Sequence, residues 1–456
     1  MLKTQKPICL LLLFLSLVVI KASAQQPTNP QQYSLQEAID YAIKNNTEIL
    51  NADLENKISQ KQINEILADG LPQVFANLDL VNNHNIQTAF VPANAFDPSG
   101  DPNEVGALAF GVNYTGLASL RVEQMIFDGS FFVGLQAARI YTELSRKAHI
   151  KTTIDVVEAV TKAYYTVLIN REMAELVTKN YTRLDSLLTD TKIMYQNGFV
   201  EQIDVDRIKV EHNNVKVEKD HLDKMLRISE SLFKFQAGFD LNAQIELTDK
   251  IDNVVLDKHV EKVDNFNYEN RIEYSSLQTQ KTLNNLDLKN TKSQYIPKVN
   301  LYATYGANTG TQKFGGLFDL NEHPWHRLGV IGVGMNWQIF DGMRKSAQAQ
   351  QKKYKAEQIE NDISSAMVGI DLEIEQSISD YNKSIDNMNA QKENMELARN
   401  IYETTEIKYK EGVGSNSEVL DADASLKQSQ TNYYNAFFEA LVSRVELQKA
   451  LGELYK

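Results

Sequence analysis

The sequence predicts a mainly α-helical protein with a smaller β portion, built from a helix–strand–strand–long helix–helix unit that occurs twice. The first observation behind this fold class is an internal repeat, which is typical of a duplicated architecture. The second is a pair of long segments, 135–197 and 343–411. The first of them contains no glycine or proline, and the second contains only Gly369. Because glycine and proline are the residues that interrupt helices, both segments predict long helices.

Five anchors recur in the same order in the two halves of the chain, and together they define the repeat. They are Asn46-Thr47-Glu48-Ile49 and Asn270-Arg271-Ile272-Glu273, Leu71-Pro72 and Ile296-Pro297, Ile126-Phe127-Asp128-Gly129 and Ile339-Phe340-Asp341-Gly342, Tyr195 with Gly198 and Tyr409 with Gly412, and Gly238 and Gly452. The offset falls from 225 to 213 between the second and third anchors, so repeat one should have a loop 12 residues longer there. We assign repeat one to 34–238, repeat two to 269–456 and an inter-repeat segment to 239–268.

Each repeat is expected to open with a helix and a pair of strands. Ser34-Leu35-Gln36-Glu37 has the spacing of a capping box, which satisfies free N–H groups at a helix start, and this helix should run to about Ala68. Apolar and polar residues alternate in the strand pairs at about 73–127 and 298–340, which predicts strands with one apolar face and a half-buried position. Between the strands we expect loops rich in Pro, Gly, Asn and Asp, at 92–116 and 306–326.

Long helical hairpins are expected at about 130–238 and 343–452. From Ile150 to Leu188 apolar residues step by threes and fours, close to the 3.5-residue spacing of a coiled-coil seam, and Arg171 is the one misfit. A glycine follows the first helix of each hairpin, Gly198 in one and Gly412 in the other. Glycine in this position predicts a left-handed cap that ends the helix.

The N-terminus and the composition exclude several classes of protein. Residues 1–24 have the basic start, apolar centre and small-residue cleavage site of a secretory signal peptide, and a linker is expected at 25–33. The lone cysteine, Cys9, lies within this signal, so a disulfide framework and a cysteine-based metal site are excluded. A net charge of −13 argues against a nucleic-acid partner. We expect no catalytic residues, no metal site and no cofactor.

Four strands are too few to close a membrane barrel, so strands of this chain could span a bilayer only in an oligomer. The doubled element order, the prolines at 72 and 297 and the Ile-Phe-Asp-Gly turns at 126–129 and 339–342 resemble the TolC-like outer membrane factor family over residues 33–456. The resemblance implies a homotrimer in a Gram-negative type of envelope. Its twelve strands would form an outer-membrane β-barrel surrounded by lipid and continuous with a periplasmic α-helical coiled-coil barrel, with 239–268 in an equatorial position.

The same resemblance implies a passive exit duct of a tripartite efflux or type I secretion system. The partners would be a periplasmic adaptor (membrane fusion) protein and an inner-membrane transporter of the RND or ABC type. Drugs, metals and secreted proteins all stay open as cargo, because a duct need not carry a specificity pocket. The alternative is a periplasmic coiled-coil adaptor or scaffold without a channel. An adaptor would present one helical hairpin, whereas this sequence has two, each preceded by an amphipathic strand pair.

The resemblance also implies where partners dock and where the duct narrows. The turns Gly198-Phe199 and Gly412-Val413 correspond to the periplasmic tips at which adaptors dock. Glu418 and Asp421 correspond to acidic rings at the narrowest point, and their spacing of three places both on one helix face. Such rings would select for cations. The alternative is a solvated helix N-terminus, where acids interact favourably with the helix dipole.

The closed state of the family is held by links from an acid to a tyrosine and an arginine. Asp204 corresponds to the acid and Tyr409 to the tyrosine, but Gly414 stands in the place of the arginine. Since charge-assisted hydrogen bonds are the stronger ones, we expect a closed state that is weaker. It would be held by Asp204 and Tyr409 alone, or by other residues such as Arg207 or Lys410.

Overall fold

A computed structural model describes residues 31–455, apart from 96–98, 100, 102, 252, 253, 255, 257 and 258. The expected signal peptide, Cys9 and the first part of the linker lie outside the described residues. The chain divides into two compact units. One comprises the described residues within Met1–Asn46, Val156–Lys258 and Ser384–Val442, and the other comprises those within Thr47–Asp155, His259–Lys383 and Ser443–Lys456. Each unit therefore takes segments from both sequence repeats.

The first unit begins with a short strand where a linker was expected. Strand β1 (Gln31–Tyr33) pairs in parallel with β6 (Ile245–Leu247). The Tyr33 ring also packs edge-on against Phe239 and Tyr41, with centroid distances of 4.9 and 5.8 Å. The linker interpretation is therefore wrong for residues 31–33, because a partner more than 200 positions away orders them.

The opening helix has the predicted start but not the predicted end. Helix α2 (Leu35–Asn45) begins with the capping box, in which the backbone N–H of Glu37 donates to Ser34 Oγ and the N–H of Ser34 donates to the Glu37 carboxylate. The helix expected to reach Ala68 is interrupted at Asn46, which is extended (φ −66°, ψ 130°). Helix α3 (Thr47–Asp69) follows. The buried Asn46 side chain donates to the backbone oxygen of Gln236 at 2.8 Å, which stabilises the interruption.

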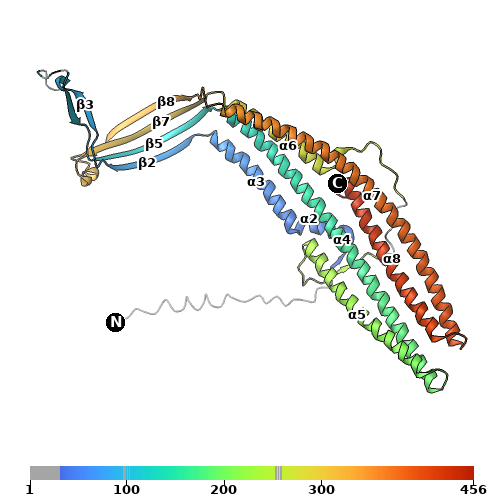
Figure 1. Cartoon of the computed structure of the whole chain (residues 1–456). Coiled ribbons are helices and arrows are strands. Elements are labelled where there is room, and N and C mark those ends of the chain that lie inside the picture. Colours follow the sequence, from blue (N-terminus) through green and yellow to red (C-terminus); the bar gives the residue numbers. More distant parts are fainter. Residues whose placement is uncertain are drawn as a thin grey trace, which may run out of the picture. The chain divides into compact units, whose positions relative to one another are not determined.

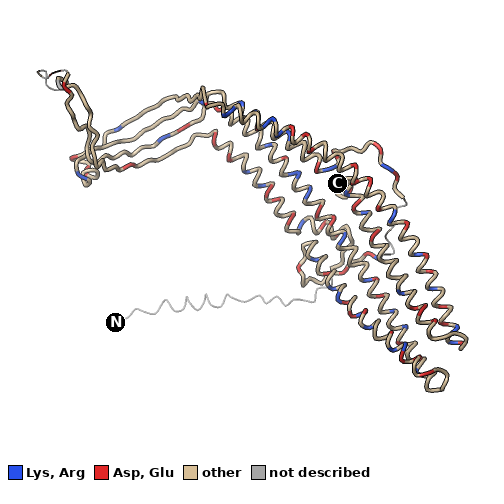
Figure 2. The backbone as a smooth tube through the Cα atoms, in the orientation of Figure 1, with Lys and Arg blue, Asp and Glu red and all other residues tan. Residues whose placement is uncertain are grey.

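The long helices are as predicted. They are α4 (Gly129–Gln196), α5 (Gln202–Ala237), α7 (Arg344–Lys410) and α8 (Asn416–Ala450), and α6 (Ile272–Ser293) opens repeat two after a 3-10 turn, η3 (Tyr268–Asn270). Gly369 lies inside α7 without interrupting it. Lys and Arg are interspersed with Asp and Glu along these helices (Figure 2). No helix in the part of the chain that the structure describes has an apolar stretch able to cross a membrane.

The predicted seam of α4 is buried in the first unit, and its misfit has a partner. Val157, Val160, Tyr164 and Val167 are fully covered. The Arg171 guanidinium donates from Nη1 to the backbone oxygen of Leu247 at 2.9 Å. The charged residue of the seam thus satisfies a carbonyl of β6, which would otherwise lose a hydrogen bond on burial.

The second unit contains a four-stranded antiparallel sheet in the order β2-β5-β7-β8 (Figure 1). The strands are β2 (Gln73–Asn82), β5 (Tyr114–Phe127), β7 (Lys298–Thr311) and β8 (His326–Asn336). Their register places Val74, Val122, Ala303 and Ile331 in one row, so the apolar faces predicted for separate strands form one continuous face. Val74 and Ile331 are exposed. The half-buried position expected for the strands is therefore found in the central strands β5 and β7, whereas the edge strands β2 and β8 are mostly exposed.

The connections between the strands contain more structure than expected. A hairpin of β3 (Thr88–Pro92) and β4 (Val105–Ala109), with a 3-10 turn η1 (Ala93–Ala95), lies between β2 and β5. A second 3-10 turn, η4 (Phe314–Phe318), lies between β7 and β8. The loop interpretation of 92–116 and 306–326 is wrong where β4, β5, β7 and η4 occupy these ranges.

The last strand is shorter than its alternation predicts. Trp337 and Ile339 continue the apolar pattern, but β8 ends at Asn336. Asn336 is paired with Lys298, the first residue of β7, so the strand has no neighbour on that side beyond this point. Trp337 donates from Nε1 to the backbone oxygen of Tyr295 instead.

Candidate functional site at the helix tips

The two helical hairpins end in turns of the same geometry. Gly198 and Gly412 have φ values of +79° and +76°, so the predicted left-handed caps are present. In each turn the next residue donates its N–H back to the helix, Phe199 to Met194 and Val413 to Lys408. The caps leave Phe199 and Val413 uncovered, and these residues are 78% and 77% exposed.

A shared core joins the two hairpins below the turns. It contains buried residues from all four long helices: Leu184 of α4, Ile208 of α5, Tyr402 of α7 and Leu426 of α8. Because one apolar cluster includes side chains from both repeats, the two tips belong to one folded body within the first unit.

The expected link between Asp204 and Tyr409 is not made within the described part of the chain. One carboxylate oxygen of Asp204 accepts the N–H of Glu201 at 3.3 Å and caps α5. Asn416 Nδ2 donates to the backbone oxygen of Asp204 at 3.1 Å and to the other carboxylate oxygen at 3.3 Å. Tyr409 is buried, and its hydroxyl lies 3.4 Å from Thr191 Oγ1. Two separate contacts between the repeats thus replace the expected one.

The place of the missing arginine is tightly packed. A Cβ on Gly414 would lie 3.1 Å from the backbone nitrogen of Tyr409. The two residues expected to substitute for the arginine have other surroundings. Lys410 pairs with Glu406 of its own helix at 3.1 Å, and Arg207 borders an open groove between α5 and α8.

Glu418 and Asp421 both lie exposed near the start of α8. Glu418 accepts the N–H of Ser415 at 3.4 Å and donates its own N–H to Ser415 Oγ at 3.3 Å, so it completes a capping box. The structure therefore gives Glu418 the role of a helix-terminus acid. Asp421 lines the groove of about 490 Å³ that Arg207, Ile203 and Val210 border from α5.

Sequence reasoning missed a cluster of charged residues inside the tip. The buried Asp423 pairs with Arg183 of α4, and Lys427 Nζ lies 2.8 Å from Asp423 and 2.6 Å from Glu211 of α5. The Arg183 guanidinium lies over the ring of Tyr402, 4.3 Å from its centroid. The spacing of four between Asp423 and Lys427 was visible in the sequence. Their partners were not, because Arg183 is 240 positions away.

Burial and these contacts together shift two pKa values. Burial raises the pKa of Glu211, but the hydrogen bond and charge of Lys427 outweigh it and hold that pKa below its ordinary value of 4.5. Burial also raises the pKa of the Tyr402 hydroxyl, and the nearby charge of Arg183 only partly opposes this.

Comparison with known proteins identifies the family that shares this architecture. The model of the family "Outer membrane efflux protein" matches residues 278–453. Outer membrane protein TolC of Salmonella enteritidis is 20% identical over 438 residues, which are 94% of this chain and 83% of TolC. The chain is similar to the TolC-like outer membrane efflux proteins, and the family model matches its second repeat. The resemblance found in the sequence is thereby confirmed.

Solved structures of outer membrane channels share the fold of this TolC-like chain. VceC of Vibrio cholerae has a TM-score of 0.66 at 16% identity, covering 92% of this chain and 96% of VceC. CmeC of Campylobacter jejuni has a TM-score of 0.70 at 15% identity, covering 92% of this chain and 86% of CmeC. The match extends over both repeats, so the duplicated unit is the fold that this chain shares with these outer membrane proteins.

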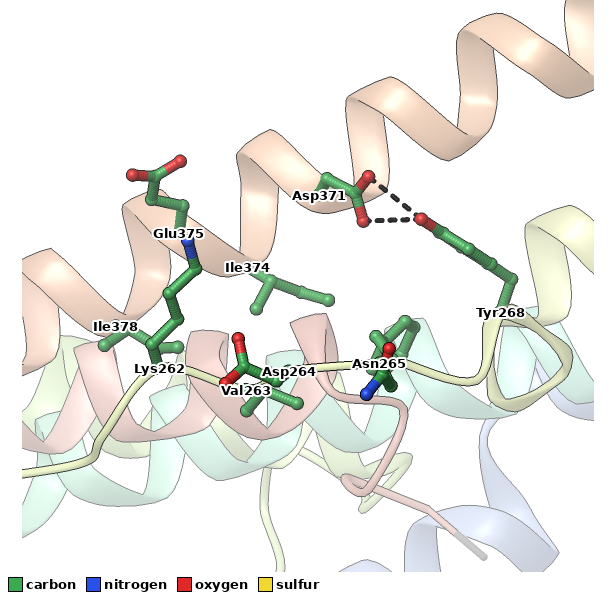
Figure 3. A pocket seen from close by; sticks show the side chains of 10 residues that line it. Lys262, Val263, Asp264, Asn265, Tyr268, Asp371, Ile374, Glu375 and Ile378 are labelled. Atoms are coloured by element: carbon green, nitrogen blue, oxygen red, sulfur yellow. Dashed lines mark hydrogen bonds between the residues drawn. The ribbon is translucent and has the colours of Figure 1, made fainter.

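The second unit of the TolC-like chain also carries a polar groove of about 590 Å³, between the end of the inter-repeat segment and α7 (Figure 3). Tyr268 donates its hydroxyl to both carboxylate oxygens of Asp371, at 2.8 and 2.9 Å, and this raises the pKa of Tyr268. The contact joins the inter-repeat segment to the helix. Among the described residues, no group of three or more His, Cys, Asp or Glu side chains is placed to hold a metal ion.

Proposed function

We propose that the chain forms, as a homotrimer, the outer-membrane channel of a tripartite export system, with its helical portion in the periplasm. The observation that carries this proposal is the four-stranded sheet, whose apolar face is exposed and whose edges are formed by β2 and β8. Four strands cannot close a membrane barrel, but three copies joined edge to edge supply twelve. The exposed apolar face then contacts lipid.

The opposite face of the sheet supports a water-filled interior. Arg121 and Glu123 lie on it and pair at 2.5 Å, and the Arg121 guanidinium lies 5.7 Å from the centre of the Tyr302 ring. Charged side chains are costly on a lipid face and are usual on the inner face of a membrane barrel. The duct is passive, and an inner-membrane transporter of the RND or ABC type supplies the free energy of transport.

The tips are the docking points for a periplasmic adaptor. Gly198 and Gly412 form turns that leave Phe199 and Val413 exposed, and exposed apolar side chains on a protein surface mark interaction sites. Asp204 with Asn416 and Tyr409 with Thr191 hold the closed tip in place of the link to the missing arginine.

Membrane fractionation of the full chain, with native mass measurement of the purified protein, tests the proposed function. We expect an outer-membrane trimer that produces discrete conductance steps in planar bilayers. A soluble monomer would contradict the proposal and would favour a periplasmic adaptor or scaffold.

Glu418 and Asp421 are proposed as the acidic constriction of the duct, since both are exposed and three copies would gather up to six carboxylates. Replacing both with alanine should weaken the cation preference of the channel and its block by a trivalent cation. Glu411→Ala, which removes another exposed acid of the same tip, is the matched control. If the double variant and the control leave selectivity equally unchanged in an intact trimer, these acids only stabilise the helix terminus.

A further inference from the structure

The connection between β2 and β5 forms an apolar hairpin beyond the end of the sheet (Figure 1). Its strands, Thr88–Pro92 and Val105–Ala109, contain no charged residue, and Phe90 is 74% exposed. The nearest acids, Asp101 and Glu104, lie outside the two strands. This hairpin belongs to the connection that is longer in repeat one than in repeat two. An exposed apolar element of this kind indicates a surface that another molecule covers.

A second exposed apolar surface lies at the same end of the sheet. In the register of the strands, Asn82 is opposite Tyr114 and Tyr114 is opposite Thr311, so the connections after β2 and after β7 leave the sheet together. The connection after β7 carries η4, where Phe318 is 63% exposed and Phe314 and Leu320 are exposed as well. Within one chain the hairpin does not cover η4, and η4 does not cover the hairpin, because most of the surface of Phe90 and of Phe318 stays exposed.

The order of the strands in the sheet indicates which molecule could cover the hairpin and η4. The hairpin follows β2, which is one edge of the sheet, and η4 precedes β8, which is the other edge. If copies join edge to edge, β2 of one copy lies beside β8 of the next. This arrangement places the hairpin of one copy next to η4 of its neighbour. The inference rests on the trimer of the proposed function.

We propose that the β3–β4 hairpin of each copy packs on the η4 turn of the neighbouring copy and forms an apolar collar at this end of the strands. A second copy is the better occupant than lipid. A lone two-stranded hairpin is marginally stable in water. In hydrocarbon its edge N–H and C=O groups would be unsatisfied, and open sheet edges do not occur there. A neighbouring protein surface covers the phenylalanines and leaves those edges in contact with water or protein.

Disulfide trapping between copies tests the collar, because Cys9 is the lone cysteine of the sequence. In a Cys9→Ser background, a tagged Phe90→Cys chain is co-expressed with an untagged Phe318→Cys chain, and mild oxidation is followed by non-reducing electrophoresis. We expect a linked pair that contains one chain of each kind. The matched control is Met335→Cys in place of Phe318→Cys. Met335 is 66% exposed on β8, the edge strand that follows η4, but it is paired with Val299, near the opposite end of the sheet. Its yield of linked pairs should be several-fold lower.

The native mass of the same sample separates the possible failures. A trimer in which only Phe90→Cys chains link to one another would overturn the collar, because the hairpins would then meet each other. A trimer without any link, in which brominated lipids quench a fluorophore attached to the Phe90→Cys chain at its introduced thiol, would overturn it in favour of lipid contact. Loss of the trimer in the parent chain would overturn the proposed function itself.

Discussion

Each of the two units contains a junction of the same kind, at which the glycine after a long helix lies against a segment from the start of the same repeat. Repeat one supplies the junction of the first unit, and repeat two supplies that of the second. In the first unit Gly238 follows α5 and lies against the end of α2, where an added Cβ would be 2.8 Å from the backbone oxygen of Asn45. In the second unit Gly452 follows α8, and a Cβ there would come even closer to the backbone oxygen of Asn270. Both glycines have positive φ, +78° and +68°. Glycine therefore occurs at both positions because the backbone has a positive φ there and because a Cβ atom would collide with the neighbouring backbone.

The polar residue at the junction differs between the units, although the bond it makes does not. Asn46 donates from Nδ2 to the backbone oxygen of Gln236 at 2.8 Å, and Arg271 donates from Nη1 to that of Ala450 at 3.0 Å. Arg271 also pairs with Glu373 at 2.8 Å and with Glu273 at 3.2 Å. The fold requires a donor to this carbonyl, and a neutral amide or a cation can supply it.

The largest effect is expected from replacing the junction glycines. Gly452→Ala should lower the free energy of unfolding by about 2–5 kcal/mol, because alanine is strained at a positive φ and its Cβ would collide with backbone atoms of Asn270. Gly238→Ala should cost less, because its nearest backbone atom is farther away. Thermal unfolding of the purified trimer, followed by circular dichroism, measures both.

Gly369→Ala is the matched control, since Gly369 lies inside α7 with no atom close to an added Cβ. It should stabilise the chain by up to about 1 kcal/mol through helix propensity. A Gly452→Ala variant as stable as this control would show that space does not explain the duplicated glycine.

Removing the side-chain donors Asn46 and Arg271 should lower the free energy of unfolding by a smaller amount, and this amount should differ between the two units. Asn46→Ala leaves a buried carbonyl without its donor, at a cost of about 1–2 kcal/mol. Arg271→Met should cost about 2–3 kcal/mol, because it removes the same bond and two ion pairs. At 1 M salt the Debye length is about 3 Å, so the two costs should move closer together, though only in part, because the Arg271 side chain is buried and salt screens buried pairs less. Urea unfolding at low and high salt measures the difference, and an Arg271→Met variant that costs no more than Asn46→Ala at low salt would mean that charge does not distinguish the junctions.

The junction glycines and the sheet faces could be predicted from the sequence because their signals are local. Gly238 and Gly452 recur at the repeat offset, and the alternation of Val74 and its neighbours gives one face of a strand. The break at Asn46 and strand β1 could not be predicted, since both depend on partners about 190 or more positions away. The end of β8 likewise depends on where β7 begins.

The same distinction holds at the helix tips. The caps at Gly198 and Gly412 follow from local residue type, and they are present. A direct contact between Asp204 and Tyr409 is not made within the described part of the chain, because contacts between repeats depend on how α4, α5, α7 and α8 face one another. Asn416 and Thr191 take these places, and no local pattern singles them out.

The smallest expected effect concerns the charged contacts of the first unit, whose junction is neutral. The pKa of Glu211 in the folded chain lies below 4.5, so its carboxylate contributes stability above that pH. This contribution is lost as the pH falls through the folded pKa. Between pH 5 and 3 the free energy of unfolding should therefore fall less in Glu211→Gln than in the parent. The difference should be below about 1 kcal/mol, because the pair is partly exposed and solvent screens it.

The matched control for this pH effect is Asp206→Asn, because Asp206 lies on the same helix and accepts a hydrogen bond from the neutral Gln202 on an exposed surface. Lys427→Met should reproduce the reduced pH dependence, since it removes the charge that lowers the pKa of Glu211. If the parent, Glu211→Gln and Lys427→Met respond identically to acid, the Lys427–Glu211 pair does not contribute. Among the charged contacts of this tip, the buried Asp423 with Arg183 would then be the next pair to test.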